Sequence, residues 1–455
     1  MRADASEKDR VGYHVGKVRD VLGDPRLQDV LGRAAAQVPG DEPPRAKVAA
    51  LLSTDDLDAM ASSGGGPHGV PYLSRAPLVS MVQSQLEESL RAAGVPDPAE
   101  RPSSLWARFV RFAEQLLHLR PGSFTPEDPD WYLDIAGGVL ERLARGNAPF
   151  NDSPAEYDGL SDDARLVVVG DWGTGLPRAR DVAAQMRKAI DEALASGRQV
   201  HVLHLGDVYY SGMEDEDKRR FLDLWPVTRE QAGAGVTSWS LNGNHDMYSG
   251  GFGYFGTLLG DPRFVGQRSP DGRPTSFFRL RSPSWDFIGI DTAWDDDVVS
   301  TGQVAVLQDP QGTYVAQVAD GSARKLVLFS HHQLVSFYDT SEVGSTLPDR
   351  LAHVLNDRRV TAWWWGHEHR AITYGAAAGV QYPRCLGNGG VPAPPVPDPP
   401  AGSSPPISWH STRSVREQGQ TWTRFGFAVL DLRPDRIEVA YVDDDGHTAH
   451  TETVA

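Results

Sequence analysis

The sequence predicts an α/β protein, and two observations lead to that class. From about residue 164, short apolar runs alternate with segments of helical spacing, in the order strand, helix, strand, helix, strand. The runs are almost continuously apolar, as in "RLVVVGD", which is typical of parallel strands covered on both faces. We therefore expect a largely parallel sheet with helices packed against it.

The expected elements follow one another along the chain. Strands are predicted at "RLVVVGD", "QVHVLHLGD", "TSWSLNGNHD", "RKLVLFSHH" and "RVTAWWWGHEH", helices at 179–196 and 216–225, a hairpin at "TSFFRLRS" and "WDFIGID", and an antiparallel pair in 424–450. The segment 391–406 contains eight prolines, so 391–409 is expected to be an extended loop insertion. These elements make up a predicted catalytic domain over residues 161–455.

Residues 1–160 have a different pattern. Apolar residues recur at helical spacing in 76–94, 104–119 and 130–146, and "SSGGGPHG" marks a flexible break. We predict a mostly helical N-terminal region, and we identify no catalytic motif in it.

Composition limits the function classes. The 455 residues carry a formal net charge of −17, which disfavours binding to nucleic acid or anionic membranes. The single cysteine, Cys385, excludes an internal disulfide and cysteine-based metal clusters. The N-terminus lacks the apolar core of a signal peptide, and no run reaches the roughly 18 apolar residues of a membrane span, so a cytoplasmic protein is expected. The oligomeric state is left open.

The stretch "VVVGDWGTG" raises the question of whether its glycines or its aspartate carry the chemistry. Gly170, Gly173 and Gly175 stand in the wrong order for a dinucleotide fingerprint, and no Gly-Lys-Ser/Thr follows. Taken alone, the stretch is better explained as an ordinary strand-to-helix turn. Asp171 is the residue that fits a wider pattern.

That pattern is a polar side chain at the carboxyl end of five predicted strands. The residues are Asp171, Asp207, Asn244-His245-Asp246, His331-His332 and His367-Glu368-His369. Ligands of open α/β sheets bind at this end. Two carboxylates, an amide and three imidazoles exceed the needs of one tetrahedral zinc, but suit two ions that share a bridging carboxylate. Each motif by itself could be a helix cap or a turn; the set in order is what indicates a metal site.

The ordered blocks "GDWG", "GDVYY", "GNHD", "SHH" and "GHEH" resemble the calcineurin-like metallophosphoesterases, and within them the purple acid phosphatase branch. Most of the superfamily has Asp-x-His in the first block; here Gly173 takes the histidine position and Tyr210 lies three residues after Asp207. The resemblance covers about residues 164–450. It implies an αββα sandwich of two central mixed β-sheets flanked by helices.

The resemblance also implies a role for each residue. The first metal would bind Asp171, Asp207, Tyr210 and His369, with Asp207 bridging, and the second Asn244, His331 and His367. His331 is preferred to His332, although Gln333 replaces the proline of the family's His-x-Pro pattern. His245, oriented by Asp246, would stabilise the transition state or protonate the leaving oxygen.

A phenolate ligand calls for a strongly Lewis-acidic ion, so Fe³⁺ is expected beside the tyrosine, with Fe²⁺, Zn²⁺ or Mn²⁺ in the second site. The implied reaction is in-line attack by a metal-bound hydroxide on a small phosphomonoester or phosphodiester. A nucleotide phosphodiesterase or nuclease on the same scaffold, and a non-catalytic binding protein, are the alternatives.

Several other residues receive expectations of their own. His201 and His204 are expected to be packed or hydrogen-bonded, Tyr209 to neighbour the ligand, "AWWWG" to be a buried strand and Trp294–Asp297 to be a solvated loop. Arg384 and Arg424 are candidates for contact with a substrate phosphate.

Overall fold

The computed structural model describes residues 80–81, 83–85, 87–88, 145–296, 304–339, 346–400, 402–417 and 420–455. The chain divides into two compact units, one of Met1–Asn147, Tyr248–Gly250 and Asp297–Gly302, and one of the remainder. In the first unit, the described positions between 80 and 88 are helical. The predicted helix at 104–119, the predicted break at 62–69 and nearly all of the predicted helix at 130–146 lie outside the described residues.

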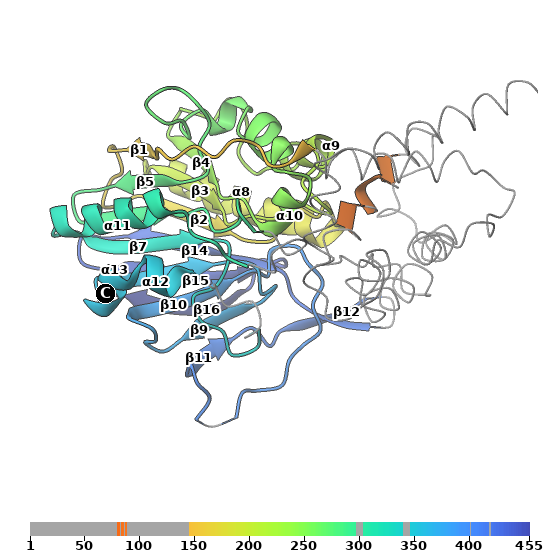
Figure 1. Ribbon diagram of the computed structural model, residues 1–455. Helices are drawn as coiled ribbons and strands as arrows, with labels where there is room; N and C mark the ends of the chain where they lie inside the picture. Colours follow the sequence, from red (N-terminus) through yellow and green to blue (C-terminus); the bar gives the residue numbers. More distant parts are fainter. Residues whose placement is uncertain are drawn as a thin grey trace, which may run out of the picture. The chain divides into compact units, whose positions relative to one another are not determined.

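One large sheet of the second unit has six strands in the order β16-β15-β14-β2-β3-β4 (Figure 1). Neighbouring β2, β3 and β4 run parallel, whereas β14, β15 and β16 pair antiparallel. The strands are β2 (Arg165–Val169), β3 (Val200–His204), β4 (Val236–Ser240), β14 (Gly426–Leu432), β15 (Ile437–Asp443) and β16 (Thr448–Val454).

The second large sheet has eight strands in the order β1-β5-β6-β7-β8-β10-β9-β11 and is also mixed. These strands are β1 (Ala155–Tyr157), β5 (Phe278–Arg281), β6 (Trp285–Gly289), β7 (Lys325–Ser330), β8 (Val360–Trp365), β9 (Ala371–Tyr374), β10 (Val380–Leu386) and β11 (Ile407–His410). A separate pair consists of β12 (Ser414–Glu417) and β13 (Gln420–Thr423). The expected pair of mixed sheets is confirmed, and so is the hairpin β5–β6.

The main core lies between the two large sheets. Apolar side chains from both sheets, among them Val168 of β2, Phe329 of β7 and Trp364 of β8, form one fully buried cluster. Trp363 and Trp365 point to the opposite face of β8, because side chains alternate along a strand, and join a second cluster with helical residues. The prediction that "AWWWG" is a buried strand is confirmed, and β8 is apolar on both faces.

The helices cover the outer faces. Val182, Met186 and Ile190 of α8 are buried at four-residue spacing, and α8 contacts β2, β3 and β14. The helical segments are α8 (Pro177–Ala195), α9 (Glu214–Glu216), α10 (Asn244–Tyr248), α11 (Asp309–Gly321), α12 (Leu347–Arg350), α13 (Ala352–Asn356), the π-helices η1 (Asp217–Leu222) and η2 (Gly253–Leu258), and the 3₁₀ turn η3 (Pro262–Phe264). The predicted helix at 179–196 is confirmed, and the one at 216–225 is a π-helix that ends earlier, at Leu222.

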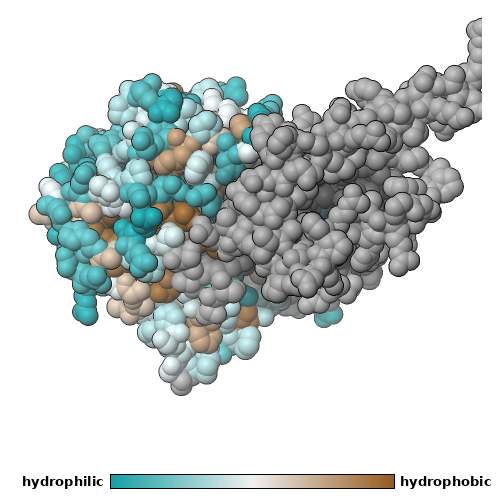
Figure 2. Space-filling view, in the orientation of Figure 1, coloured by the Kyte–Doolittle hydropathy of each residue, from teal (hydrophilic) through white to brown (hydrophobic). Residues whose placement is uncertain are grey.

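The predicted proline-rich loop needs one correction. Residues 391–400 and 402–406 have no helix or strand, but 407–409 belong to β11, which pairs with β9. Figure 2 shows many hydrophilic side chains on the visible face of the described residues, in keeping with the charge of −17. None of the described helices has the length and apolar content needed to cross a bilayer.

Candidate metal centre

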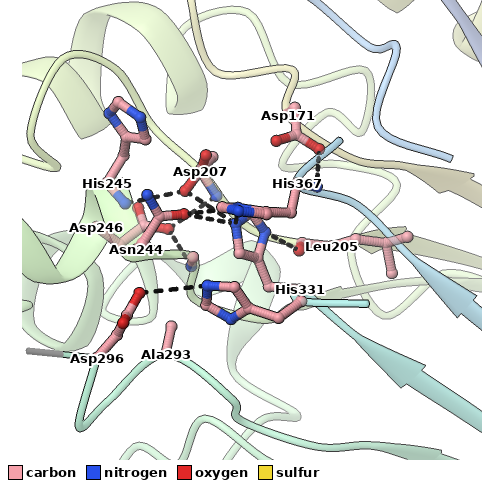
Figure 3. Close-up of polar contacts among 12 residues, drawn as sticks. Asp171, Leu205, Asp207, Asn244, His245, Asp246, Ala293, Asp296, His331 and His367 are labelled. Carbon is pink, nitrogen blue, oxygen red and sulfur yellow. Dashed lines mark hydrogen bonds and ion pairs between the residues drawn. The ribbon is translucent and has the colours of Figure 1, made fainter. Parts of the chain in front are cut away.

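The predicted polar residues follow strands of both large sheets. Asp171 comes after β2, Asp207 after β3 and Asn244 after β4, all in the six-stranded sheet. His331 follows β7, and His367 and His369 follow β8, in the eight-stranded sheet. Figure 3 shows Asp207, Asn244, His331 and His367 close together where these loops meet. The five chain segments therefore converge, although they come from two sheets and not from one edge.

Glycines in the motifs allow this close approach. A Cβ on Gly243 would lie 2.1 Å from Oδ1 of Asp207, and one on Gly366 would lie 2.6 Å from Oδ2 of Asp171. Any larger residue would displace the carboxylates, so the glycines make room and the aspartates face the cluster. Within "VVVGDWGTG", Asp171 faces the cluster, whereas Gly170 and Gly173 allow close packing: a Cβ on Gly170 would lie 2.6 Å from the carbonyl oxygen of Leu386, and one on Gly173 2.9 Å from that of Asp207.

Four residues of the cluster have left-handed backbone angles. The φ values are 54° for Asp171, 79° for Asp207, 65° for His367 and 53° for His369. Each such non-glycine conformation costs on the order of 1 kcal/mol and is concentrated at functional sites in proteins. The surrounding sheets and hydrogen bonds hold these residues in the geometry that turns their side chains inward.

His331 provides a nitrogen ligand atom of defined protonation. Its Nδ1 donates to the carbonyl of Leu205 at 2.9 Å, which leaves Nε2 as the unprotonated ring atom. Nε2 lies 2.9 Å from Oδ1 of Asn244, 3.1 Å from Nδ1 of His367 and 3.4 Å from Oδ1 of Asp207. Burial is the main cause that lowers the pKa of His331 to about 4. His331 therefore faces Asn244, His367 and Asp207, whereas the ring of His332 lies beside that of His367, with 4.5 Å between their centres.

The lone pairs that these side chains present to one another are suited to binding a cation. The Nε2 lone pair of His331 and the amide oxygen of Asn244 are both acceptors, and they face each other at 2.9 Å. Asp171, Asp207 and His331 offer ligand atoms within 4.8 Å of one another, as do His331, His332 and His367. Imidazole and carboxylate are suitable ligands for Zn²⁺, Mn²⁺ and iron. The arrangement is consistent with a site for two metal ions.

The tyrosine hydroxyl at the cluster belongs to Tyr209. It donates to Oδ2 of Asp207 at 2.8 Å, lies 3.0 Å from Nε2 of His369 and 3.4 Å from Oδ1 of Asp171. Tyr210, the predicted ligand, contributes its backbone carbonyl to His245 and stacks its ring against Arg220, 4.4 Å from the guanidinium carbon. Tyr209 therefore neighbours the predicted ligands, as expected, and it also brings its own hydroxyl to them.

His245 lies beside the cluster but is held differently from the expectation. Its Nδ1 donates to the carbonyl of Tyr210 at 2.6 Å, and its ring centre is 4.3 Å from that of Tyr209. Asp246 was expected to orient this ring. Its carboxylate instead accepts from the backbone N–H groups of Asp207, Val208 and Gly243 at 2.9, 3.2 and 2.7 Å, so it fixes the two ligand loops.

Burial and neighbouring charges set the protonation of the two carboxylates in opposite directions. Burial opposes the charge on Asp207, but the imidazoles of His331, His245 and His367 and the hydrogen bond from Tyr209 together hold its pKa below the ordinary value. Burial, and next the charge of Asp207, raise the pKa of Asp246 well above the usual range. The backbone hydrogen bonds to Asp246 only partly offset this rise.

Two further groups support the cluster, and sequence reasoning gave neither of them this supporting role. His332 has Nδ1 3.0 Å from Oγ1 of Thr292 and Nε2 3.2 Å from Oδ2 of Asp296. The side chain of Asp296 is only 1% exposed, so the expectation of a solvated loop around it is wrong. Two features of the sequence could have pointed to these roles: the pair of adjacent histidines, and the acidic run that follows a buried strand.

Glu368, between the two histidines of "GHEH", is the second such group. Its Oε1 accepts from the indole N–H of Trp365 at 2.7 Å, and its Oε2 accepts from the hydroxyl of Ser336. Burial is the first cause that raises the pKa of Glu368 to about 7. These contacts tie the turn after β8 to the segment after β7.

The remaining predictions concern residues outside the cluster. His201 lies 2.6 Å from the hydroxyl of Thr237 and His204 lies 3.3 Å from that of Ser240, so both are buried and hydrogen-bonded as predicted. The candidate phosphate contacts are instead engaged in ion pairs, Arg384 with Glu452 and Arg424 with Asp444, both at 2.6 Å.

Comparisons with known proteins place this geometry in context. Residues 164–371 match the family model of the calcineurin-like phosphoesterases. Among solved structures, the chain is similar to GAP50, the anchor in the inner membrane complex of Plasmodium, at 15% identity over 64% of this chain and 88% of that one, with a TM-score of 0.46. It is also similar to a dimetal phosphatase from Danio rerio at 14% identity, over 64% of this chain and 99% of that one, with a TM-score of 0.43. No match was found among curated proteins.

Proposed function

We propose that the protein hydrolyses phosphate esters at a two-metal site, on the premise that residues 164–371 belong to the calcineurin-like metallophosphoesterase superfamily. One observation carries the proposal: acceptor atoms from five separate loops face one another in a buried cluster, with the unprotonated Nε2 of His331 2.9 Å from the amide oxygen of Asn244. The substrate class we propose is a small phosphomonoester or phosphodiester.

We assign the metal ligands to two groups that share Asp207. Asp171, Asp207 and His369 would hold one ion, and Asp207, Asn244, His331 and His367 the other. Two bound cations would lower the pKa of a water molecule and neutralise the phosphate oxygens. Oxygen and nitrogen donors of this kind accept iron, zinc or manganese, so the metals are left to measurement.

The phenol of the first group is assigned to Tyr209 in place of Tyr210. Its hydroxyl is 2.8 Å from Oδ2 of Asp207 and 3.0 Å from Nε2 of His369, which puts it within reach of an ion held by these residues. An Fe³⁺-loaded sample would then absorb visible light through tyrosinate charge transfer. We expect Tyr209→Phe to remove that band and Tyr210→Phe to retain it; the opposite result would restore Tyr210 as the ligand.

His245 is proposed as the proton donor to the leaving oxygen. The hydrogen bond from Nδ1 to the carbonyl of Tyr210 fixes the ring and makes Nε2 the atom that exchanges a proton with the substrate. Packing of the ring against Tyr209, at 4.3 Å between centres, places it beside the proposed ligands. Asp246 acts indirectly, because it binds the backbone of the loops that carry Asp207 and Asn244.

The test combines metal analysis with an ester panel. Protein purified without chelators is expected to hold metal and to hydrolyse p-nitrophenyl phosphate, bis-p-nitrophenyl phosphate or a cyclic nucleotide. Asp207→Asn removes the bridging charge and should lower both metal content and turnover by more than about 100-fold, beyond the loss typical of an outer-sphere partner. Asp181→Asn, at an exposed position of α8, is the matched control. Protein that retains neither metal nor activity after loading with iron, zinc or manganese would refute the proposal.

A further inference from the structure

Arg370 directly follows the proposed ligand His369, and its charge is not neutralised. It forms no ion pair with any residue that the structure describes, although its side chain is partly exposed. Three other arginines of the C-terminal part are paired, Arg384 with Glu452, Arg413 with Asp443 and Arg424 with Asp444. Arg370 differs from other described arginines without an ion pair, such as Arg358, in its place directly after a proposed metal ligand, in a chain of net charge −17.

The backbone and the side chain of Arg370 are both held in place. Its carbonyl accepts from the backbone N–H of Gly387 at 2.7 Å and from the thiol of Cys385 at 3.2 Å. Its guanidinium carbon lies 5.2 Å from the ring centre of Tyr338, within the range of a cation–π contact. Such a contact orients the planar group without using its N–H donors, which leaves them for a ligand.

Tyr338 is in turn fixed from two directions. Its hydroxyl donates to the carbonyl of Pro397 in the proline-rich loop at 3.1 Å. The segment that carries it is joined to the "GHEH" turn by the hydrogen bond from Ser336 to Glu368. The proline-rich loop is also attached at His410, whose Nε2 lies 3.1 Å from Asp398. Arg370 is therefore held by contacts that involve both the "GHEH" turn and the proline-rich loop.

We propose that Arg370, supported by Tyr338, binds a second anionic group of the substrate, a phosphate or carboxylate, while the reacting phosphate occupies the Asp/His cluster. The inference rests on the proposed function and narrows its substrate class to esters with two anionic groups. A planar guanidinium with free N–H donors suits bidentate contact with either group. Tyr338 is a positioning residue in this scheme, because it acts through Arg370.

The experiment compares alkanediol bisphosphates of increasing chain length with the monophosphates of the same length. The holoenzyme is expected to prefer the bisphosphate by about 10-fold or more in kcat/KM at one optimal length, the usual scale of one charge-assisted contact. In Arg370→Ala the ratio of the two kcat/KM values should fall close to one, and in Arg370→Lys part of the preference should remain. Binding of the corresponding alkane bisphosphonates, measured by calorimetry, should weaken in parallel in Arg370→Ala.

Three variants separate this role from a general loss of charge or fold. Arg358→Ala removes an exposed arginine that precedes β8, at the opposite end of that strand, and should keep the preference of the parent. Tyr338→Leu removes the ring and should reduce the preference, whereas Tyr338→Phe keeps the ring and should reduce it less. A preference that survives in Arg370→Ala, or a holoenzyme that shows none at any length, overturns the inference.

Failure of the proposed function gives a different result. If the parent hydrolyses neither these esters nor the p-nitrophenyl and cyclic-nucleotide panel, the phosphoesterase proposal fails, and the bisphosphonate titration still tests Arg370. If the parent hydrolyses monophosphates and bisphosphates equally well, the phosphoesterase proposal stands and the Arg370 subsite is rejected.

Discussion

The two large sheets contribute different chemistry to the same cluster. The loops after β2, β3 and β4 supply Asp171, Asp207 and Asn244, which offer oxygen atoms. The loops after β7 and β8 supply the imidazoles of His331, His367 and His369. An oxygen-bearing side and a nitrogen-bearing side thus meet where the sheets pack together, and neither sheet alone presents all the proposed ligands.

The two sides are also fixed by different means. On the oxygen side, buried carboxylates accept from backbone N–H groups: Asp246 accepts from three, and Glu216 accepts from Tyr210, Ser211 and Met213. On the nitrogen side, single side-chain contacts do most of the orienting, such as Nδ1 of His331 to the carbonyl of Leu205. Leu205 directly follows β3, so this contact crosses from one sheet to the other. Metal binding should therefore depend on how well the sheets are docked.

The largest effect on metal binding and turnover is expected from substitutions that distinguish the two adjacent histidines, His331 and His332. His331→Asn removes the atom that faces Asn244, His367 and Asp207, so metal content and turnover should fall by more than about 100-fold. His332→Asn removes a group held by Thr292 and Asp296, so the loss should be about 10- to 100-fold, as for an outer-sphere partner. Metal analysis and kcat/KM on one ester measure both. A larger loss in His332→Asn would show that the ligand is the second histidine.

Sequence reasoning picked out residues that the fold brings together because the signals for them are local. Each ligand follows a strand, and each motif glycine stands where a side chain would strike a carboxylate, as Gly243 and Gly366 do. Such positions can be read from one stretch of chain at a time. The choice of His331 over His332 also agrees with the geometry, since Nε2 of His331 faces Asn244.

Features set by distant contacts could not be read in the same way. Which of two adjacent phenols faces the cluster depends on the path of the loop from 207 to 213, and that path is fixed by Asp246 and Glu216. The roles of Asp296 and Glu368 depend on burial under other segments, which composition does not reveal. The division of the strands between two sheets came from family resemblance and not from the alternation of apolar runs.

A smaller effect is expected on the oxygen side from Glu216→Gln. The glutamine amide keeps one acceptor oxygen, so backbone N–H groups that now reach the other oxygen of Glu216 lose a partner. The free energy of unfolding should fall by about 1–3 kcal/mol, the cost of buried unpaired groups, and metal affinity by about 10-fold. Urea unfolding and metal titration measure the two. Glu214→Gln, exposed at the start of α9, is the control; an equal loss there would contradict a specific role for Glu216.

The smallest effect on turnover, and the clearest dependence on pH, is expected from Asp217→Asn. Asp217 is fully buried, and its two carboxyl oxygens have no hydrogen-bond donor. Burial first, and then the charges of Asp246, Glu216 and Glu214, raise its pKa well above the ordinary value. The folded protein therefore keeps this proton at a pH where the unfolded chain has lost it, so the group destabilises the fold increasingly as pH rises above about 4.

Asparagine resembles the protonated acid and does not ionise, so the variant should escape this penalty. We expect the urea midpoint of Asp217→Asn to increase relative to that of the parent between pH 5 and pH 8. The reason is that the parent alone loses stability as pH rises toward the raised pKa of Asp217. Asp223→Asn, exposed at the end of η1, should show no such gain. A difference between Asp217→Asn and the parent that does not change with pH would mean that Asp217 is ionised in the fold. The oxygen side would then hold a buried, uncompensated charge close to Asp246 and Glu216.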